Sequence, residues 1–480
     1  MNTSRSTPHT FDLVVIGSGV AGLSAAVEAA EAGLTVHVLE AADTVGGASV
    51  MSGAACFIVD TPLQRSQGIT DSVGLALDDW GRMGGPTADL EWAGRYVADS
   101  AREVYQWLAD LGIEWQALDQ PEGNSVPRWH VPIGWGRRIV EVLEGRVQEL
   151  GVAIRTSATA EELCFSAGRV TGVRIRSAEG VETLTAGAVA VCTGGFIGRV
   201  EKVLKHAPRL RDLPRVLAGG SPTAAGLGHD LLESCGAHFT HLDHIWVYPY
   251  GTPDPSDPSG ARGLGIRGVT TEIWLNTEGH RFHDESLRGG FSGTNALLAQ
   301  PERTAWLVFP AAEADRVMLI DNEYYGTPAG PNPEAMKKYW AESAHVRTGE
   351  GPGELARAAG LPEEAVIGAV GAFNAAVRSG ADKDPLTGRH LAGLHELTGE
   401  LAAVQLFPMA QKNLGGVRTS PDCEVLTASG EPIQGLYAAG EVAGMAGGHI
   451  NGRAALEGTM FGPCLYSGRI AGRTVARRSR

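Results

Sequence analysis

The sequence predicts an α/β fold in which a doubly wound parallel sheet is interrupted by an inserted α+β capping domain. Three observations carry this prediction. A strand, a glycine-rich turn and an alanine-rich helix follow one another in residues 11–32. Two later strands, ending near Cys192 and Gly440, also run into glycines. Between those strands, residues 236–402 change to loops rich in proline, glycine and aspartate and to amphipathic helical segments.

The first βαβ unit lies at the start of the chain. Phe11–Ile16 is a continuous apolar run, which is typical of a strand buried on both faces. We expect the helix over residues 20–32, ended by Gly33, and the next strand over residues 35–39, ended by Glu40. This order places a glycine-rich turn between a parallel strand and a helix.

The remaining strands of the same domain lie far apart in the sequence. A meander of short strands is expected at residues 152–156, 169–177 and 181–185, and a parallel strand at residues 188–192. The last strand, residues 435–440, leads into a glycine-punctuated stretch and a final helix over about residues 457–473.

Length and charge limit the domain count and the partners. A chain of 480 residues corresponds to two or three domains of roughly 100–200 residues each. We expect a dinucleotide-binding domain in residues 1–235 and 403–480, and a capping and substrate domain in residues 236–402. A formal charge of -15 argues against nucleic acid and anionic membranes as main partners.

Cysteine use and hydropathy indicate further absences. The six cysteines are scattered singly, so we expect no zinc, c-type haem or iron–sulfur site and no other bound metal. No apolar run reaches the roughly 18–20 residues that span a bilayer, and residues 1–10 lack a charged-then-apolar leader. We therefore expect a cytoplasmic protein without membrane insertion.

The glycine-rich turn fits the pattern G-x-G-x-x-G with Gly17, Gly19 and Gly22. Its position after a strand and before a helix, with Glu40 further on, is the context that a dinucleotide site requires. Gly17 permits the tight turn, Gly19 lets the backbone approach a pyrophosphate, and Gly22 lets the helix pack closely on the sheet. The helix N-terminus offers N–H groups to the phosphates, and Glu40 can accept hydrogen bonds from ribose hydroxyls. A chance glycine turn is the alternative.

A second loop of glycines and small residues, residues 45–54, indicates FAD rather than NAD. With this loop the chain resembles the fumarate reductase/succinate dehydrogenase flavoprotein family, which includes urocanate reductase and 3-ketosteroid dehydrogenases. The resemblance rests on the N-terminal βαβ unit, this loop and residues 192–195, 276–285, 415–417 and 435–472, in the family's order. It implies a Rossmann-like FAD-binding domain with an inserted cap.

Combining the motifs with the resemblance, we expect the cofactor-binding residues to be Gly17, Gly19, Val20, Ala21, Gly22, Glu40, Ala41, Gly46, Gly47, Ala48, Ser49, Ser52, Gly53, Ala54, Ala160, Thr193, Gly194, Gly195, Gly440, Glu441, Gly458, Thr459, Met460 and Phe461. Membrane-bound members of the family bond a histidine of the second loop covalently to the flavin. This loop offers Ser49 and Ser52 instead, which implies non-covalent FAD.

At the C-terminal end, the resemblance implies that Glu441 contacts the ribityl and phosphate region of FAD. Residues 458–463 resemble the GATIGPA-type run of ketosteroid dehydrogenases, and we expect them to open the last helix. A helix N-terminus at the N1/O2 edge of the flavin would stabilise its anionic reduced form. The alternative is a helix that only packs.

In the expected cap, residues 276–285 resemble the family hairpin that precedes a proton-donating arginine. Arg288 is the corresponding candidate, although it comes one residue early. An arginine with a pKa above about 12 needs a carboxylate relay, such as Asp284 or Glu285. The alternative is an Arg288–Glu285 surface pair at helical spacing. Four tyrosines of the cap are alternative proton donors, as in ketosteroid enzymes: Tyr248, Tyr250, Tyr324 and Tyr325.

Other positions depart from the fumarate reductase pattern. Tyr248 stands where a histidine is expected before Pro249, Lys412 replaces a histidine, and Arg453 lies about two residues earlier than the clamp arginine. Gly226-Leu227-Gly228 replaces G-D-G, which removes an aspartate contact to the flavin. Lys412, His449 and Arg453 suit a carboxylate, an enolate or a phenolate, so the substrate need not be fumarate. Each could instead be structural, as a solvated lysine, a loop histidine or an ion-paired arginine.

The predicted function is an FAD-dependent oxidoreductase that moves a hydride between flavin N5 and a carbon of a small-molecule substrate. The substrate would carry a C–C or C=C bond next to a carbonyl or carboxylate. Arg288, Tyr248, Lys412, Arg453 and His449 are the candidate catalytic residues. A ketosteroid-dehydrogenase-like enzyme for a bulkier cyclic ketone, an amine or alcohol oxidase or dehydrogenase, and a non-catalytic flavoprotein are the alternatives. Without a second nucleotide motif for NAD(P)H, we expect an external electron donor or acceptor.

Overall fold

The computed structural model describes residues 10–321, 324 and 332–480. Contacts divide the chain into two compact units. The first comprises Met1–Arg199, Ser221–Ile245 and Lys412–Arg480, and the second comprises Val200–Gly220 and Trp246–Gln411. The chain therefore enters each unit more than once. That the second unit caps the first stays a prediction.

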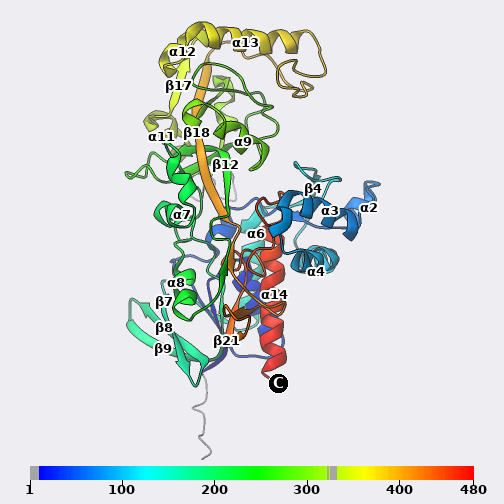
Figure 1. The fold of residues 1–480 in the computed structure, drawn as a ribbon, viewed down its shortest axis with the longest axis vertical. Coiled ribbons are helices and arrows are strands. Elements are labelled where there is room, and N and C mark those ends of the chain that lie inside the picture. Colours follow the sequence, from blue (N-terminus) through cyan, green and yellow to red (C-terminus); the bar gives the residue numbers. More distant parts are fainter. Residues whose placement is uncertain (1–9, 322–323, 325–331) are drawn as a thin grey trace, which may run out of the picture. The chain divides into compact units, whose positions relative to one another are not determined.

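The first unit is built on a mainly parallel sheet with the strand order β20-β21-β9-β1-β2-β6, of which Figure 1 labels β21 and β9. The pairs β1–β2, β1–β9, β2–β6 and β21–β9 are parallel, and β20 pairs antiparallel with β21. The strand bounds are β1 Phe11–Ile16, β2 Val36–Leu39, β6 Ala153–Arg155, β9 Gly180–Val191, β20 Glu424–Leu426 and β21 Pro432–Ala438. The predicted α/β class with a parallel sheet is confirmed.

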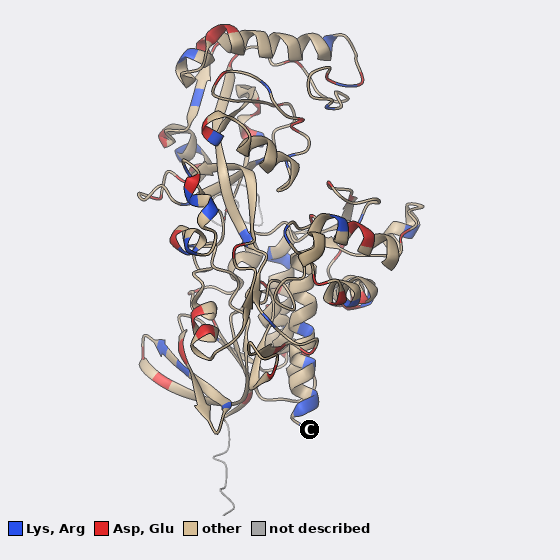
Figure 2. Ribbon diagram, in the orientation of Figure 1, with Lys and Arg blue, Asp and Glu red and all other residues tan. Residues whose placement is uncertain are grey.

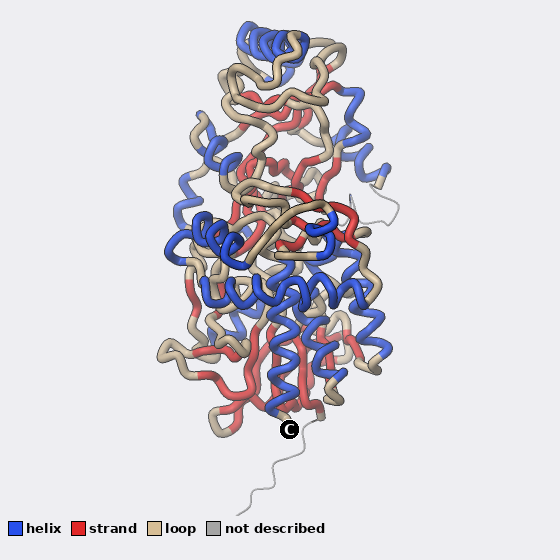
Figure 3. The backbone as a smooth tube through the Cα atoms, turned by 90° about the vertical axis from the view of Figure 1, so that its right-hand side faces the viewer, coloured by secondary structure: helices blue, strands red, loops and turns tan. Residues whose placement is uncertain are grey.

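The central strands are apolar because helices cover the sheet. In the side view of Figure 3, helices lie in front of the strands of this unit. Helix α1 (Val20–Glu31) and the last helix, α14 (Phe461–Arg478), pack so tightly that a Cβ on Gly468 would lie 2.2 Å from the carbonyl oxygen of Ala21. Basic residues gather at the end of α14, where Arg477 and Arg478 lie in its last turn (Figure 2). The predicted start of this helix near residue 457 is wrong, because residues 451–460 form turns that precede Phe461.

An antiparallel meander continues the sheet through β7 (Thr159–Ser166), β8 (Arg169–Ser177) and β9. Its strands carry opposite charges side by side (Figure 2), as in the pair of Arg176 with Glu161. The predicted strand 169–177 is confirmed. The two strands expected at 181–185 and 188–192 are one continuous strand, because Gly180–Val191 pairs first with β8 and then with β1. Strand β7 was not predicted.

The segment between β2 and β6 adds a smaller layer to the first unit. Its antiparallel sheet has the order β3-β5-β4, with β3 Cys56–Phe57, β4 Trp115–Asp119 and β5 Trp129–Pro132. The helices of this segment are η1 Gly47–Met51, α2 Pro62–Ser66, α3 Val73–Gly84, η2 Gly85–Thr87, α4 Leu90–Ser100, the π-helical η3 Ala101–Gln106, α5 Trp107–Asp110 and α6 Trp135–Glu149. Later in the chain this unit adds α8 (Leu227–Ser234) and the pair β11 (Phe239–Thr240) with β19 (Gly416–Val417).

The second unit contains a mixed sheet with the order β14-β15-β18-β12-β13-β16, and β10 and β17 also pair with β18. The strands are β10 Leu217–Ala218, β12 Ile245–Pro253, β13 Gly263–Arg267, β14 Ile273–Leu275, β15 Ala305–Pro310, β16 Met318–Ile320, β17 Val346–Gly349 and β18 Leu401–Asn413. The helices are α7 Val200–His206, η4 Pro208–Asp212, α9 Ser292–Leu298, η5 Pro301–Arg303, η6 Ala311–Arg316, α11 Pro333–Glu342, α12 Pro352–Ala359 and α13 Glu363–Arg378.

The core of the second unit forms where α12 and α13 pack on the sheet. Val366 and Phe373 of α13 are buried against Ile273 and Trp306 of β14 and β15. The amphipathic pattern of residues 363–378 predicts this helix with the bounds that the structure gives. Across the described ranges, no helix is both long enough and apolar enough to cross a membrane.

Candidate cofactor and active site

The first unit contains a groove at the carboxyl ends of its parallel strands. It encloses about 1220 Å³, solvent included, and is lined by Ile16, Leu39 and Cys192, which lie at the ends of β1, β2 and β9. Open parallel sheets bind their ligands at this edge. The predicted cofactor residues that line the groove are Gly17, Gly19, Val20, Ala21, Glu40, Ala41, Gly46, Gly47, Ala48, Ser49, Ser52, Ala160, Thr193, Gly194, Gly440, Glu441, Met460 and Phe461.

Six further predicted cofactor residues do not line the groove: Gly22, Gly53, Ala54, Gly195, Gly458 and Thr459. Gly22 lies behind the turn of Gly17, and a Cβ on Gly458 would lie 2.5 Å from Cδ1 of Trp129. Thr459 is buried and donates its hydroxyl to the carbonyl oxygen of Leu456 at 2.6 Å. Gly22 and Gly458 therefore allow close packing, and Thr459 bonds within its own turn.

The turn after β1 requires glycine at two of the three motif positions. Gly17 has φ +105°, and a Cβ there would lie 2.4 Å from the carbonyl oxygen of Cys192. A Cβ on Gly22 would lie 2.0 Å from the carbonyl oxygen of Gly17. Real Cβ atoms do not approach backbone this closely, so neither position accepts a side chain without moving the strand or the helix. These contacts are the tight turn and the close helix packing that the motif predicts.

The N-terminus of α1 opens onto the groove. Gly19 is its N-cap residue and, as glycine, places no side chain over the first N–H groups. Ser49 of the second loop reaches across and accepts a hydrogen bond from the N–H of Val20 at 3.2 Å. Gly19, Val20 and Ala21 all line the groove. A helix start of this kind binds phosphate through its N–H groups and its dipole.

Glu40 is held at the end of β2 by the two loops beside it. It is 7% exposed, and its Oε2 accepts a hydrogen bond from the N–H of Ser18 at 3.0 Å. Its Oε1 accepts one from the N–H of Ala42 at 2.9 Å. Oε2 also accepts the hydroxyl of Ser18 at 2.5 Å, whereas Oε1 keeps a second lone pair that can accept from a ribose hydroxyl. Ser18, which also lines the groove, was not predicted.

At the other side of the groove, Glu441 is partly buried and lines the groove. Its Oε1 accepts a hydrogen bond from the N–H of Asn413 at 3.1 Å, and burial raises its pKa from 4.5 to about 7. A Cβ on Gly195 would lie 2.5 Å from this Oε1, so a glycine is needed where the strand end passes the carboxylate. Gly195 thus leaves room for the Glu441 side chain and does not itself line the groove. Lys412, which also lines the groove, lowers the same pKa.

Several lining residues were missed by sequence reasoning: Ser18, Ala158, Thr159, Thr223, Ala224, Leu227, Leu231, Met445 and Cys464. Leu227 is the first residue of α8 and stands where the family has an aspartate that contacts the flavin. The resemblance could therefore have predicted that this position lines the groove. Thr223 and Ala224 precede that helix in an irregular loop without a motif. Ala158 and Thr159 lie at the start of β7, a strand that was not predicted.

Two candidate catalytic residues lie in one loop of the first unit, outside the groove. His449 is 2% exposed, and its Nδ1 lies 2.9 Å from the carbonyl oxygen of Thr87. Burial lowers its pKa to about 3, so its imidazole is neutral at ordinary pH. Arg453 is exposed and lies against Gly85, where an added Cβ would be 3.0 Å from its Nε. Lys412 is the candidate that the structure brings together with the cofactor residues.

The candidates of the second unit are Arg288 and Tyr248. Arg288 forms an ion pair with Glu272, whose Oε1 lies 2.8 Å from Nη2. The expected relay residues are engaged elsewhere: Glu285 binds Arg281, and Asp284 accepts hydrogen bonds from Ser286. The Arg288–Glu285 surface pair is wrong, because Glu285 is buried and no helix joins the two residues.

Tyr248 is 4% exposed on β12 and stacks on Tyr250, with ring centroids 4.8 Å apart. Tyr324 is also buried and donates its hydroxyl to Oδ1 of Asp254 at 3.1 Å. Tyr325 lies outside the described residues. Of the tyrosines considered as proton donors, Tyr248 and Tyr250 thus belong to one aromatic cluster, and Tyr324 is held in a separate hydrogen bond.

Comparisons with known proteins agree with this geometry. The family model described as FAD binding domain matches residues 12–460. A KsdD-like steroid dehydrogenase of Mycobacterium tuberculosis is 32% identical, over 97% of this chain and 96% of its own. A vinyl phenol reductase of Lactiplantibacillus plantarum is 31% identical, over 97% and 96%. The open conformation of a flavocytochrome c3 fumarate reductase superposes with a TM-score of 0.77 at 25% identity, covering 99% of this chain and 79% of that one.

The fold, the groove and these matches define a class of redox flavoproteins. The chain belongs to the FAD binding domain family, as the model match over most of its length shows. It is an FAD-dependent oxidoreductase related to proteins named as fumarate reductases and steroid dehydrogenases, which confirms the family, function class and cofactor predicted from the sequence. The glycine-lined turn, the open start of α1 and the fixed Glu40 are the features that fit FAD.

Proposed function

We propose that this enzyme uses its flavin to reduce, or to introduce, a C=C bond next to the carbonyl or carboxylate of a small molecule, with Arg288 and Glu272 handling the proton. Bound FAD supplies the acceptor or donor of the hydride. Support comes from the family and from relatives named as a steroid dehydrogenase and a vinyl phenol reductase. The observation that carries the proposal is the pairing of Arg288 with a buried carboxyl group.

Glu272 has the properties of a proton reservoir. It is fully buried, and burial raises its pKa above the usual value. Its Oε1 accepts hydrogen bonds from Arg288 and from the indole N–H of Trp274, at 2.8 and 3.2 Å. Within the described residues, its second oxygen, Oε2, meets no hydrogen-bond donor. A buried carboxylate oxygen that meets no donor disfavours the charged form, so the group holds a proton more strongly than an exposed glutamate does.

Arg288 links this carboxyl group to solvent-accessible space, because its side chain is about a quarter exposed while Glu272 is not exposed. A guanidinium with a pKa above about 12 donates a proton only when a neighbouring acid returns one promptly. Glu272 lies at hydrogen-bond distance and can do so. For reduction, Arg288 protonates the substrate carbon beside the one that receives the hydride, and Glu272 reprotonates Arg288. The reverse order removes the proton during desaturation.

The oxygen of the substrate gains negative charge as the hydride and the proton are exchanged, and cationic groups stabilise that charge. We assign this role to Lys412, which lines the cofactor groove, and to the exposed Arg453. His449 does not share it in our proposal, because its imidazole is neutral and bonded to Thr87. A carboxylate, an enolate and a phenolate all fit this charge requirement.

A second candidate function is the dehydrogenation of a bulkier cyclic ketone with a tyrosine as the proton-transfer group. The aromatic cluster of the second unit favours it. Trp246, Tyr248 and Tyr250 follow one another along β12, and the guanidinium carbon of Arg267 lies 4.9 Å from the centre of the Tyr250 ring. The rings are buried, and stacked aromatic side chains of this kind suit contact with a flat, apolar substrate. In this version Tyr248 replaces Arg288 as the acid and base.

We further propose that FAD is held without a covalent bond. None of the described histidines lines the groove, and the two cysteines that do, Cys192 and Cys464, have thiols whose pKa is raised by burial. Thiols are poor nucleophiles when they stay protonated. The six free cysteines also fit a reducing compartment such as the cytoplasm, with an external electron donor or acceptor.

The proposal is tested by reoxidation of the reduced enzyme. The flavin is reduced with dithionite under anaerobic conditions, and an unsaturated acid, a 3-ketosteroid enone or a vinyl phenol is added. We expect one of these classes to restore the oxidised flavin spectrum. Arg288→Met should then slow turnover roughly 10²- to 10⁴-fold at unchanged flavin content.

The control variant is Arg316→Met, because Arg316 is largely exposed and is placed outside the proposed proton path. It should turn over like the wild type. If Tyr248→Phe abolishes turnover while Arg288→Met does not, the second candidate function replaces the first. Failure of every unsaturated carbonyl or phenol to reoxidise the flavin would contradict both.

A further inference from the structure

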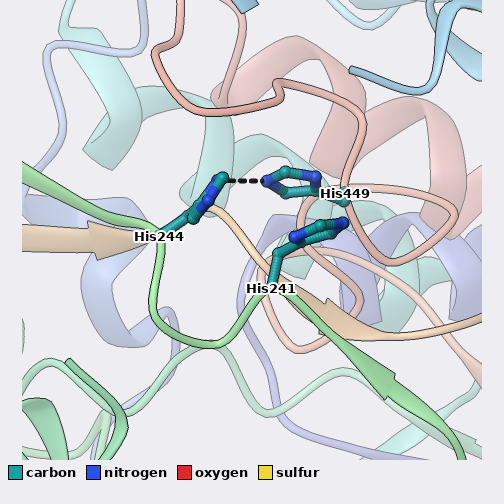
Figure 4. Close-up of side chains that lie close together, drawn as sticks. All are labelled: His241, His244 and His449. Atoms are coloured by element: carbon teal, nitrogen blue, oxygen red, sulfur yellow. Dashed lines mark hydrogen bonds between the residues drawn. The ribbon is translucent and has the colours of Figure 1, made fainter. Parts of the chain in front are cut away.

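Three histidines of the first unit come together outside the cofactor groove (Figure 4). His241 and His244 lie in the turn between β11 and β12, and His449 lies in the loop after β21. His244 and His449 are 205 positions apart in the sequence. Ring centroids are separated by 4.1 Å for His241 and His449, 4.7 Å for His244 and His449, and 5.0 Å for His241 and His244.

The hydrogen bonds of His449 define its tautomer. Its Nδ1 lies 2.9 Å from the carbonyl oxygen of Thr87, which can only accept, so Nδ1 carries the proton. Its Nε2 is therefore a lone-pair nitrogen, and Nδ1 of His244 donates a hydrogen bond to it at 3.0 Å. A ring N–H bonded to a backbone carbonyl, with the opposite nitrogen facing other ligands, is the usual arrangement of a metal-binding histidine.

The tautomer of His449 also suits metal binding, because metal ions bind the lone-pair nitrogen of an imidazole. A divalent cation at Nε2 would take the place of the hydrogen bond that His244 now donates to it.

We propose that His241, His244 and His449 form a binding site for one divalent transition-metal ion of the zinc class. One nitrogen from each ring already lies within 4.8 Å of the other two. Zn²⁺ takes histidine nitrogens at roughly 2.0–2.1 Å, so tetrahedral ligands are separated by about 3.4 Å, close to the present 3.0 Å between His244 and His449. Imidazole nitrogens are suitable ligands for zinc, cobalt and nickel.

Binding requires two local changes. His244 moves its proton from Nδ1 to Nε2, so that Nδ1 becomes a ligand. His241 turns its ring away from the stacked position on His449, where the ring planes are 24° apart. His241 is exposed, so this rotation costs little packing. A fourth position remains for water or for an anionic ligand.

The backbone at both ends of the site supports a defined position for the side chains. His241 has φ +52°, a left-handed conformation that residues other than glycine rarely adopt. Gly448, next to His449, has φ +102° and would place a Cβ 2.9 Å from the side chain of Arg418. Rare backbone conformations of this kind are concentrated at functional sites.

An occupied site would connect the turn 241–244 with the loop that carries Arg453. That loop holds the residue to which we assign charge stabilisation, so a bound metal ion would restrict its motion. The inference is independent of the redox reaction, because metal binding can be measured whether or not a substrate is known. Sequence reasoning expected no metal, because it rested on the spacing of the cysteines and did not consider these three histidines together.

The test is direct metal binding by the flavin-loaded protein. The chelator-treated protein is titrated with Zn²⁺ by calorimetry and with Co²⁺ by visible difference absorption. We expect one ion per chain and ligand-field bands with Co²⁺. His241→Ala and His244→Ala should each weaken metal affinity by at least roughly 10- to 100-fold. This is the loss typical when a residue that only hydrogen-bonds to a metal ligand is removed, and a ligand itself should cost no less.

His390→Ala is the matched control, because His390 is exposed, pairs with Asp382 and belongs to the second unit. It should bind like the wild type. Retained flavin content shows that each variant is folded, and the exposed His241 provides the variant least able to disturb the core. Two results would overturn the proposal and leave a hydrogen-bonded histidine cluster. One is the absence of stoichiometric metal binding by the wild type, and the other is wild-type metal affinity in both His241→Ala and His244→Ala.

Discussion

The cofactor groove of the first unit and the buried charges of the second unit are organised in opposite ways. The groove is formed by backbone, glycines and small side chains at strand ends. The second unit holds Arg281, Glu285, Asp384 and Arg389 in one buried ion-pair network, with Nη1 of Arg281 2.6 Å from Asp384 and Nε 3.0 Å from Glu285. One region binds charge that arrives with a ligand, and the other neutralises charge within the chain.

The difference shows which features of a site are visible in a sequence. Gly17, Gly19 and Gly22 are recognisable because one short turn needs all three at fixed spacing. Arg281 and Asp384 lie 103 positions apart, and Glu285 and Arg389 lie 104 apart, so their pairing depends on the complete fold.

The first prediction concerns backbone contacts in the groove. Gly22→Ala should abolish FAD binding, because its Cβ would lie 2.0 Å from the carbonyl oxygen of Gly17 and would displace the phosphate-binding turn. The measurement is flavin absorbance per chain after purification. Gly74→Ala is the control, since space around that glycine is open. A fully flavin-loaded Gly22→Ala protein would show that the turn does not hold the cofactor.

The second prediction removes one charge from the network of the second unit. Arg281→Met should lower the free energy of unfolding by about 3–5 kcal/mol, because it leaves Glu285 and Asp384 buried without this partner. Denaturant unfolding measures the change. Arg65→Met, at a pair exposed on both sides, should cost about 0–1 kcal/mol. Equal effects of the two substitutions would remove the distinction between the buried network and the surface.

The third prediction tests the proton reservoir. Glu272→Gln keeps the shape and the buried amide can still bond Trp274, but it cannot pass a proton to Arg288. Turnover should fall about 10²-fold, with flavin content unchanged. The exposed Glu278 provides the control, and Glu278→Gln should have wild-type kinetics. Full activity of Glu272→Gln would assign the proton to another group.

The fourth prediction follows from the raised pKa of Glu441. Between the ordinary value of 4.5 and about 7, the folded flavin-free protein keeps a proton that the unfolded chain releases. Stability therefore falls as the pH rises through this window, and the full penalty, about 3 kcal/mol, is present above it. Glu441→Gln should lose this part of the pH dependence. Parallel stability–pH curves for the two proteins would contradict it.

Much of the first unit could be predicted because local patterns determine it. The apolar run of β1, the turn after it and the helix that follows are neighbours in sequence and in space. The same reasoning placed Glu40 and Glu441 at strand ends that border one groove. It divided β9 into two strands, because the sequence of residues 180–191 does not reveal that one strand changes partners along its length.

The proton-transfer residues were less accessible to prediction. Arg288 was identified through a motif, but its carboxylate was expected within four residues and lies instead at Glu272, on the other side of the hairpin. Of the two residues expected to serve it, Glu285 forms ion pairs with Arg281 and Arg389, and Asp284 accepts hydrogen bonds from Ser286. Burial raises the pKa of a carboxyl group and so favours its protonated form. Because burial depends on how distant segments pack together, the local sequence does not show which carboxyl group is buried.

The central claim is that the glycine-lined groove of the first unit holds one FAD without a covalent bond. Denaturing the purified yellow protein with acid and analysing the supernatant by chromatography tests it most directly. We expect close to one FAD per chain in solution and a colourless protein precipitate. Flavin that remains attached to the precipitate, or a purified protein that is colourless and does not take up added FAD, would contradict it.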